Sequence, residues 1–439
     1  MNRKRVVVTG LGVVAPNGVG LAAFREALKA GKSGITHIEE LKRLNFAAQI
    51  GGTPPIGEEE ALAVIPESEL HKLSEAMIYA VMASLECAKS AGFPVDVAAG
   101  LKDGAVDWGA GVVIGCGIGG MDTIFEQMVS VIREAPMADE GRGMVEMGTN
   151  IVPQVMGSSV SVAVGRFLGA GGQTSTNSSA CNTGTEAIFE GYKHLQLGYA
   201  DAMYVGGAEG SHYAIWAGFD AMRDVLCSRY NDAPEKGSQP LGAGACGFVP
   251  SSGAGVLRLE TLESAQKRGA KILCELVAAY CNSGGQRNGG TMTFPNQEGV
   301  VRCIQRVLQD SGIDPARISL INGHLTSTTA DPREVESWLK ALGLLPEKFP
   351  LIQSTKSMIG HSLGAAGAIE SVAVIDQLVN GYVHPSINCD EVHPNIRKLG
   401  VADSIPHQLL ERRLDCVIKA SFGFGDVNGC LLFKRWDGK

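Results

Sequence analysis

Two segments of this chain present the same features in the same order, and this recurrence limits the folds open to it. In "TNSSACNTGTEAIFEGYKHLQLGYADAMYVGG" a polar turn leads into Cys181, a glycine and a helix-like stretch. In "QSTKSMIGHSLGAAGAIESVAVIDQLVNGYVHPSI" a polar turn leads in the same way into His361, 180 residues further along. Such a repeat predicts two related halves, roughly residues 1–260 and 261–439, each with a reactive residue where a loop meets a helix.

Short β-branched runs alternate with helix-like stretches along the chain. The runs are "RVVVTG", "GVVIGC", "DAMYVGG", "GVLRLE", "ILCELVAAY", "ISLING", "PLIQST", "CVIKAS" and "GCLLFKR". Amphipathic segments such as residues 297–311 lie between them, so the pattern indicates an α/β fold whose sheets are covered by helices. The last two runs are different, because "CVIKASFGFGDVNGCLLFKRW" is typical of two strands joined by a glycine-rich hairpin.

Composition excludes several classes of protein. The chain has 439 residues, of which 45% are hydrophobic and 19% charged, so it can bury a large core. Its formal charge is −8 and its basic residues form no long run, which argues against a nucleic-acid partner. The most apolar stretch, "AIESVAVIDQLV", is interrupted by Glu370 and Asp376, so we expect no membrane span. The 11 cysteines include no C-x-x-C pair, and we expect free thiols in a reducing cytoplasm.

Residues 360–364, Gly-His-Ser-Leu-Gly, fit the G-x-S-x-G elbow that presents a serine nucleophile in α/β-hydrolases. A hydrolase serine directly follows a hydrophobic strand, whereas seven mostly polar residues separate "PLI" from Gly360. Fewer than 80 residues remain after the elbow to supply the rest of the triad. We therefore favour His361 over Ser362 as the functional residue of this segment.

Residues 115–120, Gly-Cys-Gly-Ile-Gly-Gly, fit the G-x-G-x-x-G pattern that cradles a dinucleotide pyrophosphate. The region about 20 residues further on, "EAPMADEGRG", is irregular and does not resemble a second strand that ends in a ribose-binding acid. We favour the simpler interpretation, a glycine-rich loop whose backbone passes close to another segment.

One cysteine and two histidines lie at junctions between elements. Cys181 stands between a polar turn and a predicted helix, whose dipole and neighbouring amides favour the thiolate. His324 ends the strand-like "ISLINGH", and His361 opens the second loop-to-helix junction. Each residue alone could equally be a buried structural one. Together they form a candidate catalytic set, because α/β folds place their chemistry at such junctions.

At these residues the chain resembles a known family, the β-ketoacyl-acyl-carrier-protein synthases of the condensing-enzyme, or thiolase, superfamily, and most closely the type II elongation synthases. The resemblance runs nearly end to end, through "RVVVTGLGVVAPNG", "SSACNTGTEAI", "INGHLTST", "STKSMIGHSLGAAGAIES" and "ASFGFGDVNGCLLFKR". It implies two similar βαβαβ-type halves in a thiolase-like, five-layered αβαβα sandwich, which is usually a homodimer.

The resemblance also implies the site residues. Cys181 would be the nucleophile that accepts the acyl chain, and His324 and His361 would complete a Cys-His-His triad. The other matched positions are Lys356 and Glu370, which would support the histidines; Phe424, whose backbone N–H would form an oxyanion hole with that of Cys181; and Thr326 and Thr328, which would line the phosphopantetheine channel.

The implied reaction is a decarboxylative Claisen condensation in fatty acid elongation. An acyl thioester, held as acyl-Cys181, would react with malonyl-acyl carrier protein to give a chain two carbons longer. The acyl carrier protein would be the partner, and no organic cofactor and no metal are implied. A ketosynthase of a polyketide or polyene pathway is the alternative within the superfamily. A noncatalytic scaffold subunit is the alternative from another class, and the presence of Cys181 argues against it.

Several positions depart from the family pattern. Leu325 replaces a glycine after the first histidine, and Asp426 replaces a glycine in the hairpin. The family's "PFDxxRDGFVxGEGAG" reads "PLGAGACGFVPSSGAG", and residues 70–75 offer few basic groups for an acidic carrier protein. We expect effects on loop order near the gate, on chain-length preference and on carrier docking. The residues that replace charged ones are Gly242, Ala245, Cys246 and Ser252, and the basic groups retained near the docking region are His71 and Lys72.

Overall fold

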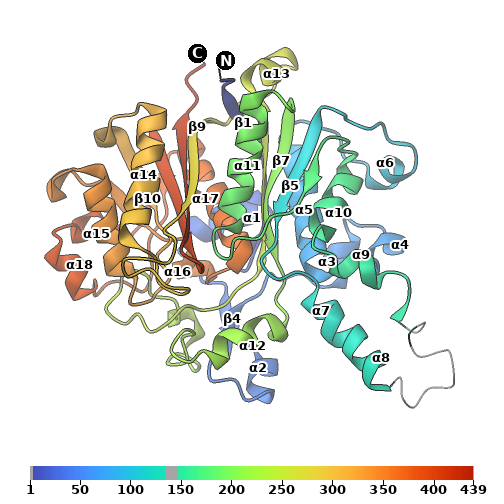
Figure 1. Ribbon diagram of the computed structural model, residues 1–439, viewed down its shortest axis with the longest axis horizontal. Coiled ribbons are helices and arrows are strands. Elements are labelled where there is room, and N and C mark those ends of the chain that lie inside the picture. Colours follow the sequence, from blue (N-terminus) through green and yellow to red (C-terminus); the bar gives the residue numbers. More distant parts are fainter. Residues whose placement is uncertain (1–2, 135–143, 145–146, 439) are drawn as a thin grey trace.

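The computed structural model describes residues 3–134, 144 and 147–438, and its elements are arranged in five layers (Figure 1). The N-terminal half contributes, in spatial order, β6 (Thr174–Ser175), β5 (Ala110–Gly115), β7 (Ala202–Glu209), β8 (Gly253–Thr261) and β1 (Val6–Ala15). The C-terminal half contributes β11 (Leu351–Gln353), β10 (Ile318–Asn322), β14 (Cys416–Gly423), β15 (Val427–Arg435) and β9 (Cys274–Ser283).

The two sets of strands have the same order and the same directions. In each, the outer three strands are parallel, and the remaining pairs are antiparallel. The sets meet where β1 pairs with β9 at only two positions, Val7 with Glu275 and Val8 with Cys274. The duplicated, thiolase-like sandwich expected from the sequence is therefore confirmed. The proposed boundary after residue 260 falls at the end of β8 and stays a prediction.

Two helices form the middle layer. α11 (Thr183–Leu197) and α17 (Ala366–Asn380) contact each other and strands of both halves. Every residue of α17 from 366 to 378 is buried, as a helix between two sheets requires. The helices approach closely at Gly367, where an added Cβ would lie 2.2 Å from Thr185 Oγ1. A larger residue at position 367 would force the two helices apart.

The outer layers are amphipathic helices. α5 (Glu75–Ser90) and α10 (Ser159–Leu168) cover the N-terminal sheet, and α14 (Gln297–Ser311) and α15 (Asp331–Leu342) cover the C-terminal one (Figure 1). α14 has the bounds that its apolar spacing predicts. Its side chains at 300, 303, 304, 307 and 308 face the core, the Asn296 side chain caps its start, and Gly312 in the left-handed region ends it.

Each of the nine β-branched runs lies in a strand, and the predicted hairpin is β14 and β15. The two-residue strand β6 was not predicted, because it is too short to carry a pattern. No helix among the described residues is long and apolar enough to cross a membrane. The segment "EAPMADEGRG", expected to be irregular, lies almost wholly outside the described residues.

The strand order determines where the site lies. Cys181 follows β6, His324 follows β10 and His361 follows β11, while Phe424 lies in the turn between β14 and β15. Because the carboxyl ends of parallel strands meet at one edge of a sheet, each half delivers its loop residues to one place. The inner helices begin at the same place, so residues far apart in sequence come together there.

Candidate active site

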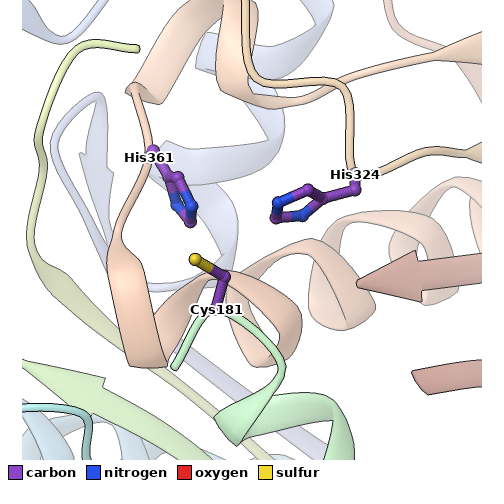
Figure 2. A group of neighbouring side chains, drawn as sticks. All are labelled: Cys181, His324 and His361. Carbon is purple, nitrogen blue, oxygen red and sulfur yellow. The ribbon is translucent and has the colours of Figure 1, made fainter. Parts of the chain in front are cut away.

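Cys181, His324 and His361 form a compact buried cluster. The thiol and the two imidazole rings point toward one another (Figure 2). The Cys181 sulfur and one ring nitrogen of each histidine all lie within 4.8 Å of one another. The imidazole ring centroids are 5.3 Å apart with nearly perpendicular planes. The three residues that the sequence singled out, from both halves of the chain, therefore share one site.

Cys181 directly precedes Asn182, the N-cap of α11. The backbone N–H groups of Phe424 and of Cys181 itself act on the sulfur and lower its pKa, and Lys356 adds a favourable charge. Burial outweighs these effects and raises the pKa of the Cys181 thiol to about 11. The helix terminus and the amides therefore favour the thiolate as the sequence suggests, but desolvation exceeds their effect.

The His361 ring is held in one tautomer. The Leu363 backbone N–H donates to His361 Nδ1 at 3.2 Å, so in the neutral ring the proton is on Nε2. No described residue bonds that Nε2, which is buried. Burial first, then the charges of Lys356 and Lys419, hold the pKa of His361 well below its usual value. The ring is therefore a neutral donor with its N–H available to a substrate.

His324 is held through its backbone. Its N–H and that of Leu325 donate to the two oxygens of the Glu334 carboxylate, each at 2.7 Å. Burial first, then Lys356, His361 and Lys419, hold the pKa of His324 well below its usual value. Burial also raises the pKa of Glu334 to about 7. Glu334 was not predicted, because nothing local in the sequence shows that it reaches back to His324.

A buried charge cluster lies behind the histidines. Lys356 begins α16 (Lys356–Ile359), and its Nζ lies 2.5 Å from Glu370 Oε1 on α17. Lys419 on β14 contacts the other oxygen of the same carboxylate at 2.8 Å. All three side chains are fully buried. The structure therefore brings the predicted pair, Lys356 and Glu370, together and adds Lys419. Lys419 was not predicted, although a lysine inside the otherwise apolar strand "CVIKAS" was a local signal for it.

A cavity of about 230 Å³ opens onto the cluster. Thr326 and Thr328 line it, with their hydroxyl oxygens 3.0 Å apart. Phe424 and Phe248 line it as well, and the Phe248 ring packs 5.1 Å from that of His361. The predicted triad, gate and threonines therefore all border one cavity, whereas Lys356 and Glu370 lie behind it.

The two competing motifs have structural roles. Strand β11 ends at Gln353, well before the elbow motif begins at Gly360, and the buried Ser362 hydroxyl bonds to that of Ser251 at 2.9 Å. The glycine loop of residues 115–120 does bind a carboxylate with its backbone N–H groups. Those of residues 117 and 118 donate to Glu209 at 3.0 and 2.9 Å, so the protein's own side chain takes the place that a pyrophosphate would need.

The segment that lacks the family's charges is held by backbone contacts. Gly242 forms a bridge with Val392, and Ala245 N–H donates to the Gly242 carbonyl at 3.4 Å. Ser252 N–H donates to the Gly52 carbonyl at 3.0 Å. The sulfur of Cys246 lies 2.6 Å from that of Cys227. Main-chain hydrogen bonds thus order this loop without the missing ion pairs.

The other two departures lie beside the cavity. Leu325 is buried with φ of 23°, a conformation that is costly for a residue with a Cβ. Asp426, at φ of 63°, accepts hydrogen bonds from the backbone N–H groups of Gln286 and Asn296, both at 2.9 Å. Asp426 therefore ties the hairpin that carries Phe424 to the loop of residues 284–296, part of which lines the cavity.

A thiol and two imidazoles are also a possible donor set for zinc. The Leu363 N–H occupies the lone pair of His361 Nδ1, which leaves a proton and not a lone pair on the Nε2 that faces the cluster. His361 as held here therefore fits a hydrogen-bond donor better than a metal ligand. The sequence prediction of no metal site and no organic cofactor stays a prediction.

Comparisons with known proteins agree with this geometry. Residues 3–265 match the family "Beta-ketoacyl synthase, N-terminal domain", and residues 273–390 match "Beta-ketoacyl synthase, C-terminal domain". The 3-oxoacyl-[acyl-carrier-protein] synthase 2 of Vibrio harveyi is 32% identical over 439 residues, which cover 99% of both chains.

Two solved structures are similar over 99% of this chain. A β-ketoacyl synthase from Burkholderia phymatum has a TM-score of 0.87 and 29% identity, with 100% of that chain covered. A type II polyketide ketosynthase, solved in complex with its acyl-carrier protein, has a TM-score of 0.84 and 28% identity, again with 100% covered.

Proposed function

Because this chain belongs to the β-ketoacyl synthases, which are condensing enzymes of the acyltransferase class, we propose that it elongates acyl chains on an acyl carrier protein in fatty acid synthesis. The proposed donor is an acyl thioester held as acyl-Cys181, and the extender is malonyl-acyl carrier protein. The polyketide ketosynthases among the similar structures fit a secondary-metabolite role as well but do not favour it.

The acylation step uses the thiol and the two amides beside it. Cys181 attacks the thioester carbonyl, and because its pKa is raised to about 11 it must lose its proton as the bond forms. A neutral imidazole of the cluster can take that proton. The carbonyl oxygen becomes an oxyanion that the N–H groups of Cys181 and Phe424 would hold, and one such donor is worth about 3 to 4 kcal/mol in comparable sites. The oxyanion then collapses, the bond to the carrier protein's sulfur breaks, and the carrier thiol leaves with the proton that the imidazole took from Cys181.

The decarboxylation step uses the two imidazoles. Loss of CO2 from the malonyl thioester leaves an enolate whose negative charge is on the thioester oxygen. A neutral His361 donating from Nε2, together with neutral His324, would stabilise charge that is present only in the transition state and the intermediate. The carbanion then attacks the acyl-Cys181 carbonyl, and the C–S bond breaks as the new carbon–carbon bond forms. Cys181 leaves as a thiolate and is reprotonated from solvent, as its raised pKa favours.

The observation that carries this proposal is the protonation state of the cluster. Both histidines have pKa values held well below the usual range, so both are neutral at pH 7. A neutral imidazole can take the proton of the Cys181 thiol as a base, and it can also donate a hydrogen bond to a charged oxygen. Two neutral imidazoles beside a thiol therefore suit a reaction that forms an acyl-enzyme and then stabilises an enolate. The same intact cluster argues against a noncatalytic scaffold.

Acyl carrier protein is the proposed partner, a homodimer the proposed assembly and the cytoplasm the proposed location. The type II polyketide ketosynthase that is similar to this chain was solved with its carrier protein, which supports the partner. Lys72, in the expected docking region, is paired with Glu69 at 3.0 Å, and the docking face stays a prediction. All eleven cysteines are free, as expected in a reducing compartment.

The test is intact-protein mass spectrometry after mixing the protein with acyl carrier proteins loaded from short to long chains. We expect an acyl adduct on wild type and on Ser362→Ala, and none on Cys181→Ser. The preferred donor, including polyenoyl and β-ketoacyl thioesters, separates fatty acid elongation from a secondary-metabolite pathway. Carrier binding without any adduct would favour the scaffold, and loss of the adduct in Ser362→Ala would favour the hydrolase.

A further inference from the structure

One carboxylate in this protein holds two buried ammonium groups. Glu370 Oε1 lies 2.5 Å from Lys356 Nζ, and Glu370 Oε2 lies 2.8 Å from Lys419 Nζ. Lys419 also donates to the Ala420 carbonyl and, at 3.1 Å, to the Ser421 hydroxyl. A buried charge persists only when it is paired and hydrogen-bonded, and Lys419 meets both conditions.

The strand places Lys419 on the catalytic side of the sheet. Along β14, residues 416, 418, 420 and 422 belong to the outer apolar cluster, whereas Val417 belongs to the inner one. Lys419 therefore faces α17 and the inner layer by the two-residue period of a strand. Its partner in register on β10 is Asn322, two residues before His324. The Lys419 ammonium thus lies behind the loop that carries one of the two catalytic histidines.

Within the Lys356–Glu370–Lys419 cluster itself, the charges do not cancel. Lys356 and Lys419 supply two positive charges and Glu370 one negative charge, all in the interior. Glu334, bonded to the His324 backbone, and Glu209, bonded to Gly364 N–H, have pKa values raised to about 7 by burial, so each is only partly ionised near neutrality. The other titratable groups that line the cavity are the Cys181 thiol, Asp224, Asp331 and Arg333. A histidine here becomes harder to protonate with each nearby ammonium group.

We propose that Lys419 is a positioning residue of the active site, which holds the second oxygen of Glu370 and brings a second ammonium group to a place where it opposes protonation of His324 and His361. The role of the histidines rests on the proposed function, whereas the effect of Lys419 on their protonation does not. Lys356 and Glu370 alone form a neutral pair. Burial lowers the pKa of Lys419, and the paired Glu370 carboxylate opposes this shift. The protonated form of Lys419 makes the cluster cationic, and this also favours the enolate that forms in front of it.

The test compares the wild type with Lys419→Met and Lys434→Met. Removing Lys419 leaves the Lys356–Glu370 pair intact, so folding should survive. Lys434 is a matched control, because it is a partly buried lysine on the neighbouring strand β15 that does not act on either histidine. Nitrogen-15 NMR of histidine-labelled protein gives the two ring titrations, assigned with His324→Asn and His361→Asn.

We expect Lys419→Met to raise the titration midpoints of both rings by up to about one pH unit, since removing one charge near a group in a protein interior has an effect of roughly that size. Lys434→Met should leave them unchanged. As the pH is lowered, Lys419→Met should lose malonyl-carrier decarboxylase activity at a higher pH than the wild type does. Unmoved ring titrations would overturn the proposal for Lys419. Shifted titrations in a protein without decarboxylase activity would support it and contradict the proposed function instead.

Discussion

The two loop-to-helix junctions occupy equivalent places in the two halves, yet their surroundings differ. The Cys181 junction offers a thiol and backbone N–H groups, and the acid of its helix, Glu186, bonds only to Ser179 and Asn177 among the described side chains. The His361 junction has the buried Lys356–Glu370–Lys419 cluster behind it. The two equivalent junctions therefore differ in chemistry: one supplies a thiol among backbone N–H groups, and the other supplies histidines backed by a buried charge cluster.

This difference shows why neither junction is sufficient alone. A thiol among backbone amides can form an acyl-enzyme but cannot stabilise an enolate on a second thioester. The neutral histidines can stabilise an enolate, but the half of the chain that carries them supplies no nucleophile. The pseudo-symmetry brings the two together at one cavity, and each half can be disabled separately.

The largest expected effect separates the halves by reaction. His361→Ala should lower malonyl-carrier decarboxylation by about 10² to 10⁴-fold, because it removes a donor that acts in the transition state. Cys181→Ala should abolish condensation but keep decarboxylation. Carbon dioxide release, measured for each variant, checks both. Equal loss of decarboxylation in the two variants would break the division described above.

The next effect concerns stability. Glu370→Gln leaves two buried ammonium groups without their carboxylate and should cost about 3 to 5 kcal/mol of unfolding free energy. The matched change in the first half, Glu186→Gln, affects partly buried hydrogen bonds only and should cost about 1 kcal/mol. Urea unfolding of both variants measures the contrast. Similar costs would mean that the charge cluster is not what distinguishes the second half.

A third buried histidine of the C-terminal half predicts sensitivity to acid. Burial lowers the pKa of His384 from 6.5 to about 4 in the folded protein. The unfolded chain therefore binds a proton first as the pH falls, and this one residue should remove up to about 3 kcal/mol of stability between pH 6.5 and 4. Unfolding free energies across that range should fall less steeply in His384→Gln than in the wild type.

The smallest effect tests the contact between the inner helices. Gly367→Ala places a Cβ 2.2 Å from Thr185 Oγ1, so it should destabilise the protein by about 1 to 3 kcal/mol. Gly218→Ala is the matched control within α12 (Tyr213–Ala221), because no atom lies within 4 Å of its added Cβ. That control should stabilise by about 0.5 to 1 kcal/mol. Thermal unfolding distinguishes the two, and a tolerated Gly367→Ala would show that the helices can separate.

Much of this arrangement could be predicted from local pattern. The apolar spacing predicted the bounds of α14, and the repeat pointed to Cys181 and His361 at equivalent junctions. The helix bounds and the two junctions could be predicted because each depends on residues that are close together in the sequence. The elbow motif was correctly set aside, because its strand ends too early.

The remainder depends on contacts between distant segments. Lys419 acts through a glutamate 49 residues away in sequence, and Glu209 fills the glycine loop from 92 residues away. The raised pKa of Cys181 was missed because burial, the dominant cause, is a property of the assembled fold. A lysine inside an apolar strand was the one local signal that could have revealed the charge cluster.

The middle layer has a consequence for the history of the chain. One continuous apolar core includes Ile188 and Met203 from the first half and Val417 and Leu431 from the second. A chain with only one half would expose the inner face of its central helix to water. Since α11 and α17 are equivalent helices that meet face to face, their contact has the form of an isologous interface. A half-length ancestor would therefore have needed a second copy of itself to fold, and gene fusion would have made that pairing permanent.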